Sequence, residues 1–505
     1  MSALRPRRHF LKTTATTGAL WAFGDLSFLS RLPAISRTDA RLDPKSVRLQ
    51  AEIEPLVRLL EETPRDQLLE KVAARIKQGL NYRELLAALL LAGVRNIQPR
   101  PVGFKFHAVL VVNSAHLASI ASPDSERWLP IFWALDYFKE SQARDVREGN
   151  WTMAPVNESA VPQAAKARQA FTGAMDNWDE AAADAAVAGL VRTSNAHDLF
   201  ELFSRYGARD FRDIGHKAIY VANSWRTLQH IGWQPAEPVL RSLAYALLYH
   251  EGDNPAKRDA EPDRPWRRNQ ARAARIRTDW QQGKPSVEAS AELLTTLRAG
   301  SNDEACDAVI EQLNRGVAPQ SIWDALFQGA GELLMRQPGL VALHAVTSTN
   351  ALHFAYETCE SDETRKMLLL QNAAFLTLFR GDPAGGKSVK IDLFEPLPLK
   401  AQGASAIEEI LAEVSNDRMT AARKMLTYLH ENPHPETLID AARQLVFVKG
   451  RSSHDYKFSS AVLEDYYHVS PAWRDRYLAA SSFNLCGSGA PDNDLVKRTR
   501  AALQA

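Results

Sequence analysis

The sequence FHAVLVVNSAH at positions 106–116 returns as LHAVTSTNALH at positions 343–353. Both copies contain His-Ala-Val, an Asn six residues after that His, and a second His nine residues after it. The shift in residue number from His107 to His344, here called the repeat offset, also relates Gly79 to Gly316 and Phe138 to Phe375. A self-match at one fixed offset indicates a duplicated chain, in which two copies of one structural plan pack together.

Histidines are the most informative residues of this repeat. Ten of the thirteen histidines fall into five pairs. Three pairs lie at the repeat offset, namely His107/His344, His116/His353 and His197/His434. The pairs His216/His454 and His230/His468 lie one position further apart, which one inserted residue explains. The duplication therefore spans roughly residues 65–250 and 302–485.

Helical periodicity runs through almost the whole chain. Residues 46–62, 65–80 and 82–94 place apolar side chains at i, i+3, i+4 and i+7. No run alternates apolar and polar residues for long enough to predict a sheet. We therefore expect an all-α, internally duplicated protein, with helical halves at 46–250 and 286–505 that are related by a pseudo-two-fold axis and pack into one globule.

Residues 251–285 connect the two halves and are rich in Pro, Asp and Arg. Their arginines allow two interpretations, an anion-binding surface or a solvated linker that leads into a charged helix. We favour the linker because runs of charge usually face water.

Composition excludes several functional classes. The chain has 61 basic and 60 acidic residues, and this balance predicts no nucleic-acid partner. Its three cysteines are widely spaced and include no C-x-x-C pair, which argues against a disulfide scaffold and a zinc ribbon. No segment has the ~18 uninterrupted apolar residues of a membrane helix, so we expect no membrane span in the mature chain.

The sequence GDPAGGKS at positions 381–388 matches the phosphate-loop pattern. Phosphate binding by this motif requires a strand before it and a helix after it. Here a helical run precedes the motif and a proline-broken segment follows it. We interpret it as a surface loop.

The N-terminus resembles the twin-arginine export signal of bacteria, with RRHFLK at positions 7–12 and a mildly apolar segment behind it. The resemblance implies that residues 1–35 bind the twin-arginine export machinery. It also implies that the folded protein is exported to the periplasm with its cofactor already loaded. A basic tail is the alternative, and the lack of a clear A-x-A site leaves cleavage open.

Helical phase decides which histidines can act together. A helix advances ~100° per residue, so His107 and His116, nine residues apart, point to nearly opposite sides. The same holds for the second copy. One histidine from each helix gives two candidate quartets, which are His107, His216, His344 and His454, or His116, His230, His353 and His468. Four imidazoles suit iron, copper or zinc, and helical proteins build such sites between facing helices.

Two features favour the quartet that begins with His107. Its members follow segments that contain Gly, Pro or Ser (101–103, 213–215, 338–339 and 450–453), where close approach is easy. In addition, Lys457 follows His454 by three residues on the same helix face. An ammonium would repel a metal ion, so we expect this lysine to be neutral, converted to a carbamate, or turned away. Hydrogen-bonded core histidines are the structural alternative.

Three stretches resemble the questin oxidase-like family of oxygenases. They are FHAV at 106–109, LHAVTSTNAL at 343–352 and His454-x-x-Lys457, the last followed by RYLAA at 476–480. The resemblance covers most of the chain in order. It implies O₂-dependent cleavage or Baeyer–Villiger-type ring opening of a polycyclic aromatic quinone, with non-haem iron as the metal. An export signal departs from the family pattern, as does His353, which stands where an arginine is expected.

The predicted site follows from these patterns. The metal ligands are His107, His216, His344 and His454, and Lys457 completes or tunes the set, as a carbamate oxygen ligand if it is modified. The groups predicted to orient these ligands are Asn113, Asn350, His116 and His353. The candidate catalytic groups are Lys457, His116 and His353. Tyr220 and Trp225 are predicted to line an aromatic pocket or to pack in the core.

Two other functions stay open. The first is an exported, non-catalytic helical protein that binds a ligand between its halves. The second is a hydrolase that uses a histidine and Asp455, which also neighbours the predicted metal site, as acid and base. No nucleophile motif supports the hydrolase.

Overall fold

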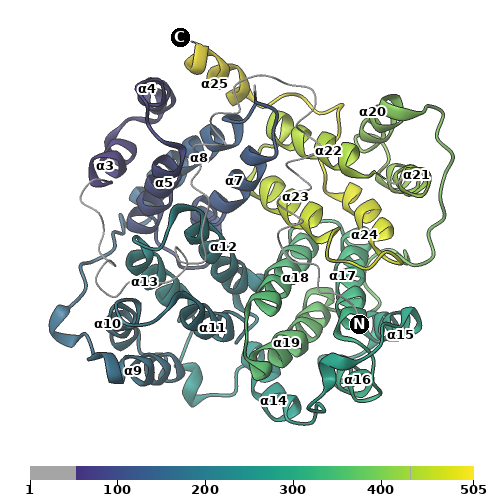
Figure 1. Ribbon diagram of the computed structural model, residues 1–505, viewed down its shortest axis with the longest axis horizontal. Helices are drawn as coiled ribbons and strands as arrows, with labels where there is room; N and C mark the ends of the chain where they lie inside the picture. The colour runs from purple at the N-terminus through teal and green to yellow at the C-terminus, as the bar shows by residue number, and fades with distance from the viewer. Residues whose placement is uncertain (1–52, 125, 433, 505) are drawn as a thin grey trace.

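Helices make up most of residues 53–504, the part that the structure describes apart from residues 125 and 433 (Figure 1). This computed structural model contains 23 α-helices and no strand in those residues, which confirms the predicted all-α class. The predicted export segment, residues 1–35, lies outside the described residues. No described helix is both long enough and apolar enough to cross a membrane.

The first predicted half shows how the sequence selects its helices. Its helices are α3 (Glu54–Glu62), α4 (Arg65–Lys77), α5 (Tyr82–Asn96), α6 (His107–Leu110), α7 (Val112–Ile120), α8 (Leu129–Glu148), α9 (Ala164–Asn177), α10 (Glu180–Val191), α11 (Ala196–Gly207), α12 (His216–Ile231) and α13 (Ala236–Leu247). The leucine- and alanine-rich α5 is apolar on every side, and all its residues from Leu85 to Val94 are buried. Asn81 caps α5 by accepting the Arg83 N–H.

The connecting segment contains one α-helix, and arginines of this segment form ion pairs with acidic residues of the following helices. The helices from here on are α14 (Arg264–Ala273), α15 (Val287–Ala299), α16 (Asn302–Asn314), α17 (Pro319–Arg336), α18 (Leu340–Thr358), α19 (Asp362–Arg380), α20 (Gly403–Glu413), α21 (Arg418–Glu431), α22 (Glu436–Lys449), α23 (Ser453–Asp465), α24 (Arg474–Ala480) and α25 (Asp494–Gln504). Arg272 pairs with Asp303 at 2.8 Å, and Arg275 with Asp307 at 2.9 Å. These ion pairs favour the linker interpretation over an anion-binding surface.

Helix starts recur at the repeat offset. α4 and α16 begin at Arg65 and Asn302, and α5 and α17 begin at Tyr82 and Pro319, so each pair is separated as His107 is from His344. The starts of α13 and α24, at positions 236 and 474, are separated as His216 is from His454. Such matched starts are what a duplicated chain requires, although the duplication itself stays a prediction.

Four helices near the centre of the molecule join the two predicted halves: α7, α12, α18 and α23 (Figure 1). α12 packs along α18, and α23 packs against α7, so both contacts cross from one half to the other. The quartet that begins with His107 lies at the N-terminal ends of α12, α18, α23 and the short α6 that leads into α7.

The sequence at positions 381–388 forms an exposed loop after α19. The Arg336 guanidinium donates to the carbonyl oxygens of Pro383 and Gly385, both at 3.2 Å. The next described helix begins only at Gly403. The loop therefore lacks the helix N-terminus that phosphate binding requires, in agreement with its interpretation as a surface loop.

Candidate metal centre

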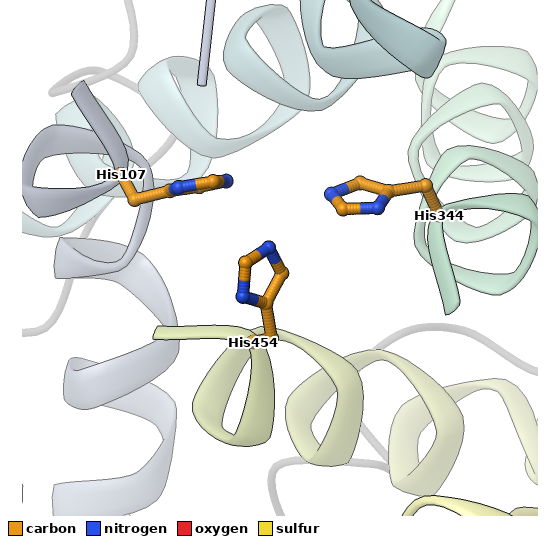
Figure 2. A group of neighbouring side chains, drawn as sticks. All are labelled: His107, His344 and His454. Atoms are coloured by element: carbon orange, nitrogen blue, oxygen red, sulfur yellow. The ribbon is translucent and has the colours of Figure 1, made fainter. Parts of the chain in front are cut away.

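Four histidines from four helices converge at one end of the central helices. His107, His344 and His454 each offer a ring nitrogen, and these nitrogens all lie within 4.8 Å of one another. Figure 2 shows the three rings extending from different helices toward a shared space. The Nε2 of His216 lies 2.8 Å from the Nε2 of His107 and 2.9 Å from that of His344. His454 is half-buried and the other three are buried.

Backbone carbonyls fix the tautomer of three of these rings. The Nδ1 of His107 lies 2.9 Å from the Phe104 oxygen, and the Nδ1 of His344 lies 2.5 Å from the Leu340 oxygen. His216 repeats the arrangement, with its Nδ1 2.6 Å from the carbonyl oxygen of Asp213. Because a carbonyl can only accept, Nδ1 carries the proton in each neutral ring. The Nε2 atoms of His107 and His344 therefore both present lone pairs to the Nε2 of His216.

Two of the three segments that supply these carbonyls have a strained backbone. Phe104 has a φ of 46°, Asp213 of 52° and Ile214 of 45°, three of the five positive values among the described non-glycine residues. A positive φ is costly for bulky or β-branched residues, and such strain concentrates at functional sites. Here it turns the carbonyls of Phe104 and Asp213 toward the histidines that they hold.

Two glycines allow the close approach that the sequence predicted. A Cβ at Gly103 would lie 3.1 Å from the His216 ring, and Gly103 has a φ of 124°. A Cβ at Gly215, which has a φ of 78°, would collide with the hydroxyl of Ser348 on α18. Any larger residue at either position would push apart the segments that bring His216 to the centre.

The four histidines are neutral at physiological pH. Burial first, and then Lys457, lowers the pKa of His107 and of His216 well below the ordinary histidine value. Burial, His216 and Lys457 do the same for the pKa of His344. Burial followed by Lys457 lowers the pKa of His454 to about 4. Neutral imidazole is the form that binds metals.

Lys457 is the second unusual group at this site. It is 2% exposed, and its Nζ has no hydrogen-bond partner among the described residues. Burial lowers the pKa of its amine well below the usual lysine value. The amine lies close enough to the four histidines to influence the pKa of each. The buried amine therefore lies near the histidines, and its state as a neutral amine or a carbamate stays a prediction.

Comparison with models of known protein families, with curated proteins and with solved structures finds no match.

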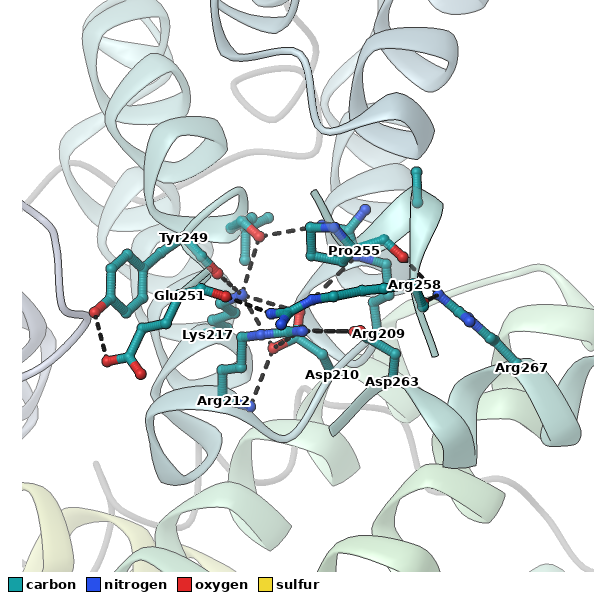
Figure 3. Close-up of polar contacts among 12 residues, drawn as sticks. Arg209, Asp210, Arg212, Lys217, Tyr249, Glu251, Pro255, Arg258, Asp263 and Arg267 are labelled. Atoms are coloured by element: carbon teal, nitrogen blue, oxygen red, sulfur yellow. Dashed lines mark hydrogen bonds and ion pairs between the residues drawn. The ribbon is translucent and has the colours of Figure 1, made fainter. Parts of the chain in front are cut away.

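A buried ion network supports the segment before His216 (Figure 3). The Lys217 ammonium, fully buried, lies 3.0 and 2.9 Å from the two carboxylate oxygens of Asp210. Arg212 donates to both oxygens of Asp263, and so ties the same segment to the connecting region between the halves. These contacts hold residues 210–217 at both ends of the strained turn.

The segment before His107 is supported in a similar way. The Lys105 ammonium is 7% exposed and lies 2.8 Å from the Asp145 carboxylate of α8. That carboxylate also accepts the backbone N–H groups of Gln98 and Trp151. A buried Lys–Asp pair thus stands beside each of the two first-half histidines.

The alternative quartet divides into two pairs. His116 lies against His230, with ring centroids 4.0 Å apart, and its Nδ1 is 2.9 Å from the Tyr82 hydroxyl. His353 lies 4.9 Å from His468 between ring centroids. The centre that contains His107 is the one group of three or more potential metal ligands found among the described residues. We therefore place His116 and His353 outside the metal centre.

The asparagines predicted to orient the ligands occupy different surroundings. Asn350 accepts a hydrogen bond from Arg226 and donates to Glu464 and Asp465 at the middle of the central helices. Asn113 is 1% exposed, and neither polar atom of its side chain has a hydrogen-bond partner among the described residues. Neither side chain forms a described hydrogen bond with a histidine of the centre, so the predicted orienting role falls instead to backbone carbonyls.

Two further predicted residues are structural. The Asp455 carboxylate accepts the backbone N–H groups of Arg451 and Ser452 and closes the capping box of α23. These contacts give the Asp455 carboxylate a structural role at the start of α23. Tyr220 is 1% exposed and donates to the Ser242 hydroxyl at 2.9 Å, which makes it a core residue.

Trp225 likewise packs in the core. It is 3% exposed, and its ring lies 4.4 Å from those of Phe200 and Trp233, measured between centroids. Core packing therefore accounts for Tyr220, whereas Trp225 also lines a small apolar cavity together with Phe200 and Trp233.

Sequence reasoning missed an ion pair between the central helices of the two halves. Arg226 on α12 lies 2.8 Å from Glu464 on α23. The separation of these two positions in the chain equals that of His216 and His454.

Proposed function

We propose that the chain is a metal-dependent oxidoreductase that holds one metal ion between His107, His216, His344 and His454. The observation that carries this proposal is the convergence of three Nε2 atoms that present lone pairs. The Nε2 of His216 lies 2.8 Å from the Nε2 of His107 and 2.9 Å from the Nε2 of His344. Ligand histidines in metal sites characteristically donate the other ring N–H to a carbonyl or carboxylate, as three of these rings do.

A cation explains this geometry better than hydrogen bonding does. Two neutral rings that face each other through unprotonated nitrogens repel, and each needs a positive partner. A proton could bridge one pair, but the resulting imidazolium would be buried beside Lys457. One cation bound between these nitrogens would give each of their lone pairs a positive partner.

The ligand set suits iron, copper or zinc, because neutral imidazoles bind all three. We propose non-haem iron, because the short motifs around these histidines resemble those of oxygenases that act on polycyclic aromatic quinones. The ion would supply redox chemistry and Lewis acidity toward O₂ and an aromatic oxygen donor. The protein residues would bind and orient the substrate.

Lys457 would act from the buried side of the centre. As a neutral amine without a partner among the described residues, it can donate a lone pair to the ion or a hydrogen bond to an oxygen group beside it. Its conversion to a carbamate would supply an oxygen ligand and add a negative charge. Substrate would approach from the side of His454, which is the half-buried member of the four histidines.

Metal analysis of protein purified without chelators tests the metal centre. We expect about one equivalent of metal in the wild type and large losses in His107→Ala and His454→Ala. His430→Ala is the matched control, because His430 is exposed on α21 and should leave the metal content unchanged. Folded wild-type protein that takes up neither iron, copper nor zinc would refute the metal centre.

An oxygen-consumption assay distinguishes an oxygenase from the alternative, a non-catalytic binding protein. Iron-loaded protein supplied with a hydroxyquinone should consume O₂, and His107→Ala should abolish the consumption. Protein that binds metal and the quinone but consumes no O₂ would instead be the non-catalytic binding protein. Export to the periplasm is a separate proposal that rests on the twin-arginine pattern alone.

A further inference from the structure

Three oxidisable rings stack on one another next to the metal centre. Trp133 and Tyr137 are one turn apart on α8, and their near-parallel rings lie 5.0 Å apart between centroids, with 22° between the ring planes. Tyr456 on α23 stacks on Trp133 in the same way, with the centroids 4.2 Å apart and the ring planes at 21°. We call Tyr456, Trp133 and Tyr137 the ring stack.

The ring stack is attached to the segments that carry two proposed metal ligands. Tyr456 follows His454 by two residues on α23, so their Cα atoms are about 5.5 Å apart. The Tyr137 hydroxyl lies 3.5 Å from the Oγ of Ser453, the residue before His454. α8 also packs against α6, which begins with His107. The stack therefore starts beside the centre.

The same stack runs from the interior toward solvent. Tyr456 is 1% exposed and Trp133 5% exposed, whereas Tyr137 is half-buried. The hydroxyl of Tyr456 has no hydrogen-bond partner among the described residues, so no described group stands ready to accept its proton. Tyr137 is the member in contact with solvent, which can accept a proton from it.

Packing of the duplicated core does not by itself require rings at these positions. Across the predicted repeat, the corresponding positions of the other copy hold buried aliphatic residues, namely Leu370, Ala374 and Ala218. The ring stack is thus present in one half only, on the side of His107 and His454. A feature that the repeat lacks in its other copy points to a role beyond the shared fold.

Indole and phenol are the neutral side chains that give up an electron most readily. Trp133 can do so without losing a proton, because its radical cation is stabilised over two fused rings. Tyr137 must lose its phenolic proton as it is oxidised, and its contact with solvent allows this. A metal that performs one-electron chemistry needs such a route if it is oxidised while no substrate is bound.

We propose that the ring stack is an electron-transfer path that carries single electrons from the surface at Tyr137, through Trp133 and past Tyr456, to the metal centre. This role rests on the proposed function, because it requires a redox-active ion. Trp133 gives one electron to the oxidised centre and becomes a radical cation. Tyr137 then gives one electron to Trp133 and its phenolic proton to water, and becomes a neutral tyrosyl radical. A reductant in solution, such as ascorbate, restores the phenol by donating a hydrogen atom.

Electron paramagnetic resonance of iron-loaded protein tests the path. The protein is treated with hydrogen peroxide as the oxidant, without substrate, and frozen. Wild-type protein should show a tyrosyl signal that ascorbate removes. Tyr137→Phe should lose the signal, because phenylalanine has no phenolic proton to release. Trp133→Phe should lose it as well, since it keeps a ring but not an oxidisable one. Both variants should retain the iron content of the wild type.

Tyr467→Phe is the matched control. Tyr467 is exposed, lies beyond the C-terminal end of α23, and meets Tyr466 edge-on rather than in a stack. This variant should keep the full signal. A signal of wild-type size in Tyr137→Phe would overturn the path, and so would its loss in Tyr467→Phe.

Two results with the wild type separate this inference from the proposed function. Iron-loaded protein that forms no tyrosyl radical with peroxide would overturn the path and leave the metal centre intact. Folded protein that takes up no iron would refute the iron centre first, and the path with it.

Discussion

The buried pair Asp210–Lys217 gives a prediction whose magnitude follows from its surroundings. Lys217 donates to both Asp210 oxygens and to the carbonyl oxygens of Leu247 and Tyr249. Burial alone would raise the pKa of Asp210, but the neighbouring cations, Lys217 foremost, hold it below the ordinary value. The carboxylate is therefore charged and central to the network.

Replacing the anion, Asp210, should lower the free energy of unfolding much more than replacing the cation, Lys217. Asp210→Asn leaves Lys217 and Arg209 buried without their principal counter-ion, which costs about 3–5 kcal/mol. Lys217→Met leaves the carboxylate in contact with the Arg212 side chain at 3.4 Å and with its backbone N–H at 3.0 Å. The lysine variant should lose about 1–2 kcal/mol, the value of its hydrogen bonds to charged and carbonyl oxygens.

The double variant makes the test stricter. Lys217→Met in the Asp210→Asn background removes a stranded charge, so the two changes together should cost less than the sum of the single changes. Urea unfolding of metal-free protein, followed by tryptophan fluorescence, measures all three. Both single variants should also lower metal affinity, about 10–100-fold, because the network positions His216. Equal stability losses for the two single variants, or additive losses in the double variant, would refute this reasoning.

Three further predictions concern the ion and the turn before His216. If the centre holds a metal, protein with free metal at 100 times its Kd should be about 2.7 kcal/mol more stable than chelated protein in thermal unfolding, and equal stability would contradict an ion bound to the native state. Burial raises the pKa of Asp213 to about 6 from 3.8, so ionisation costs stability as pH rises through that window. Asp213→Asn should therefore stabilise metal-free protein at pH 7 and have little effect near pH 3.8; equal effects at both pH values would contradict this, and Asn also tolerates the positive φ. Gly215→Ala, which collides with Ser348, should cost more in urea unfolding than Gly79→Ala, which has a φ of 97° but open space around its Cβ.

The sequence was sufficient to predict the helical class and to separate the histidines by phase. His107 and His116 lie nine residues apart, and the structure places them in different environments, one at the centre and one against Tyr82. The phase argument applies directly to His344 and His353, which share the continuous helix α18, whereas a break at Val111 separates α6 from α7 in the first copy.

Contacts between distant segments were beyond this reasoning. Asn350 shares the phase of His353, but its partners Arg226 and Glu464 come from helices that no local pattern brings together. The burial of Lys217 was equally unpredictable. A charged residue next to a histidine is expected to face solvent, and only the structure shows its buried counter-ion, Asp210. The break between α6 and α7 also escaped prediction, since the matching sequence in the second copy forms one continuous helix, α18.

The convergence of four helices has a consequence for the order of folding. His107 and His454 are separated by more than two thirds of the chain, so the proposed site exists only after nearly all of the chain has been synthesised and both halves have docked. Contacts of such long sequence separation form late, because their loop-closure entropy must be overcome first. An ion would therefore bind last, after both halves have folded and docked. Because it would be bound by residues of both halves, it would have to dissociate before the halves could separate. Metal uptake would then report the completion of folding.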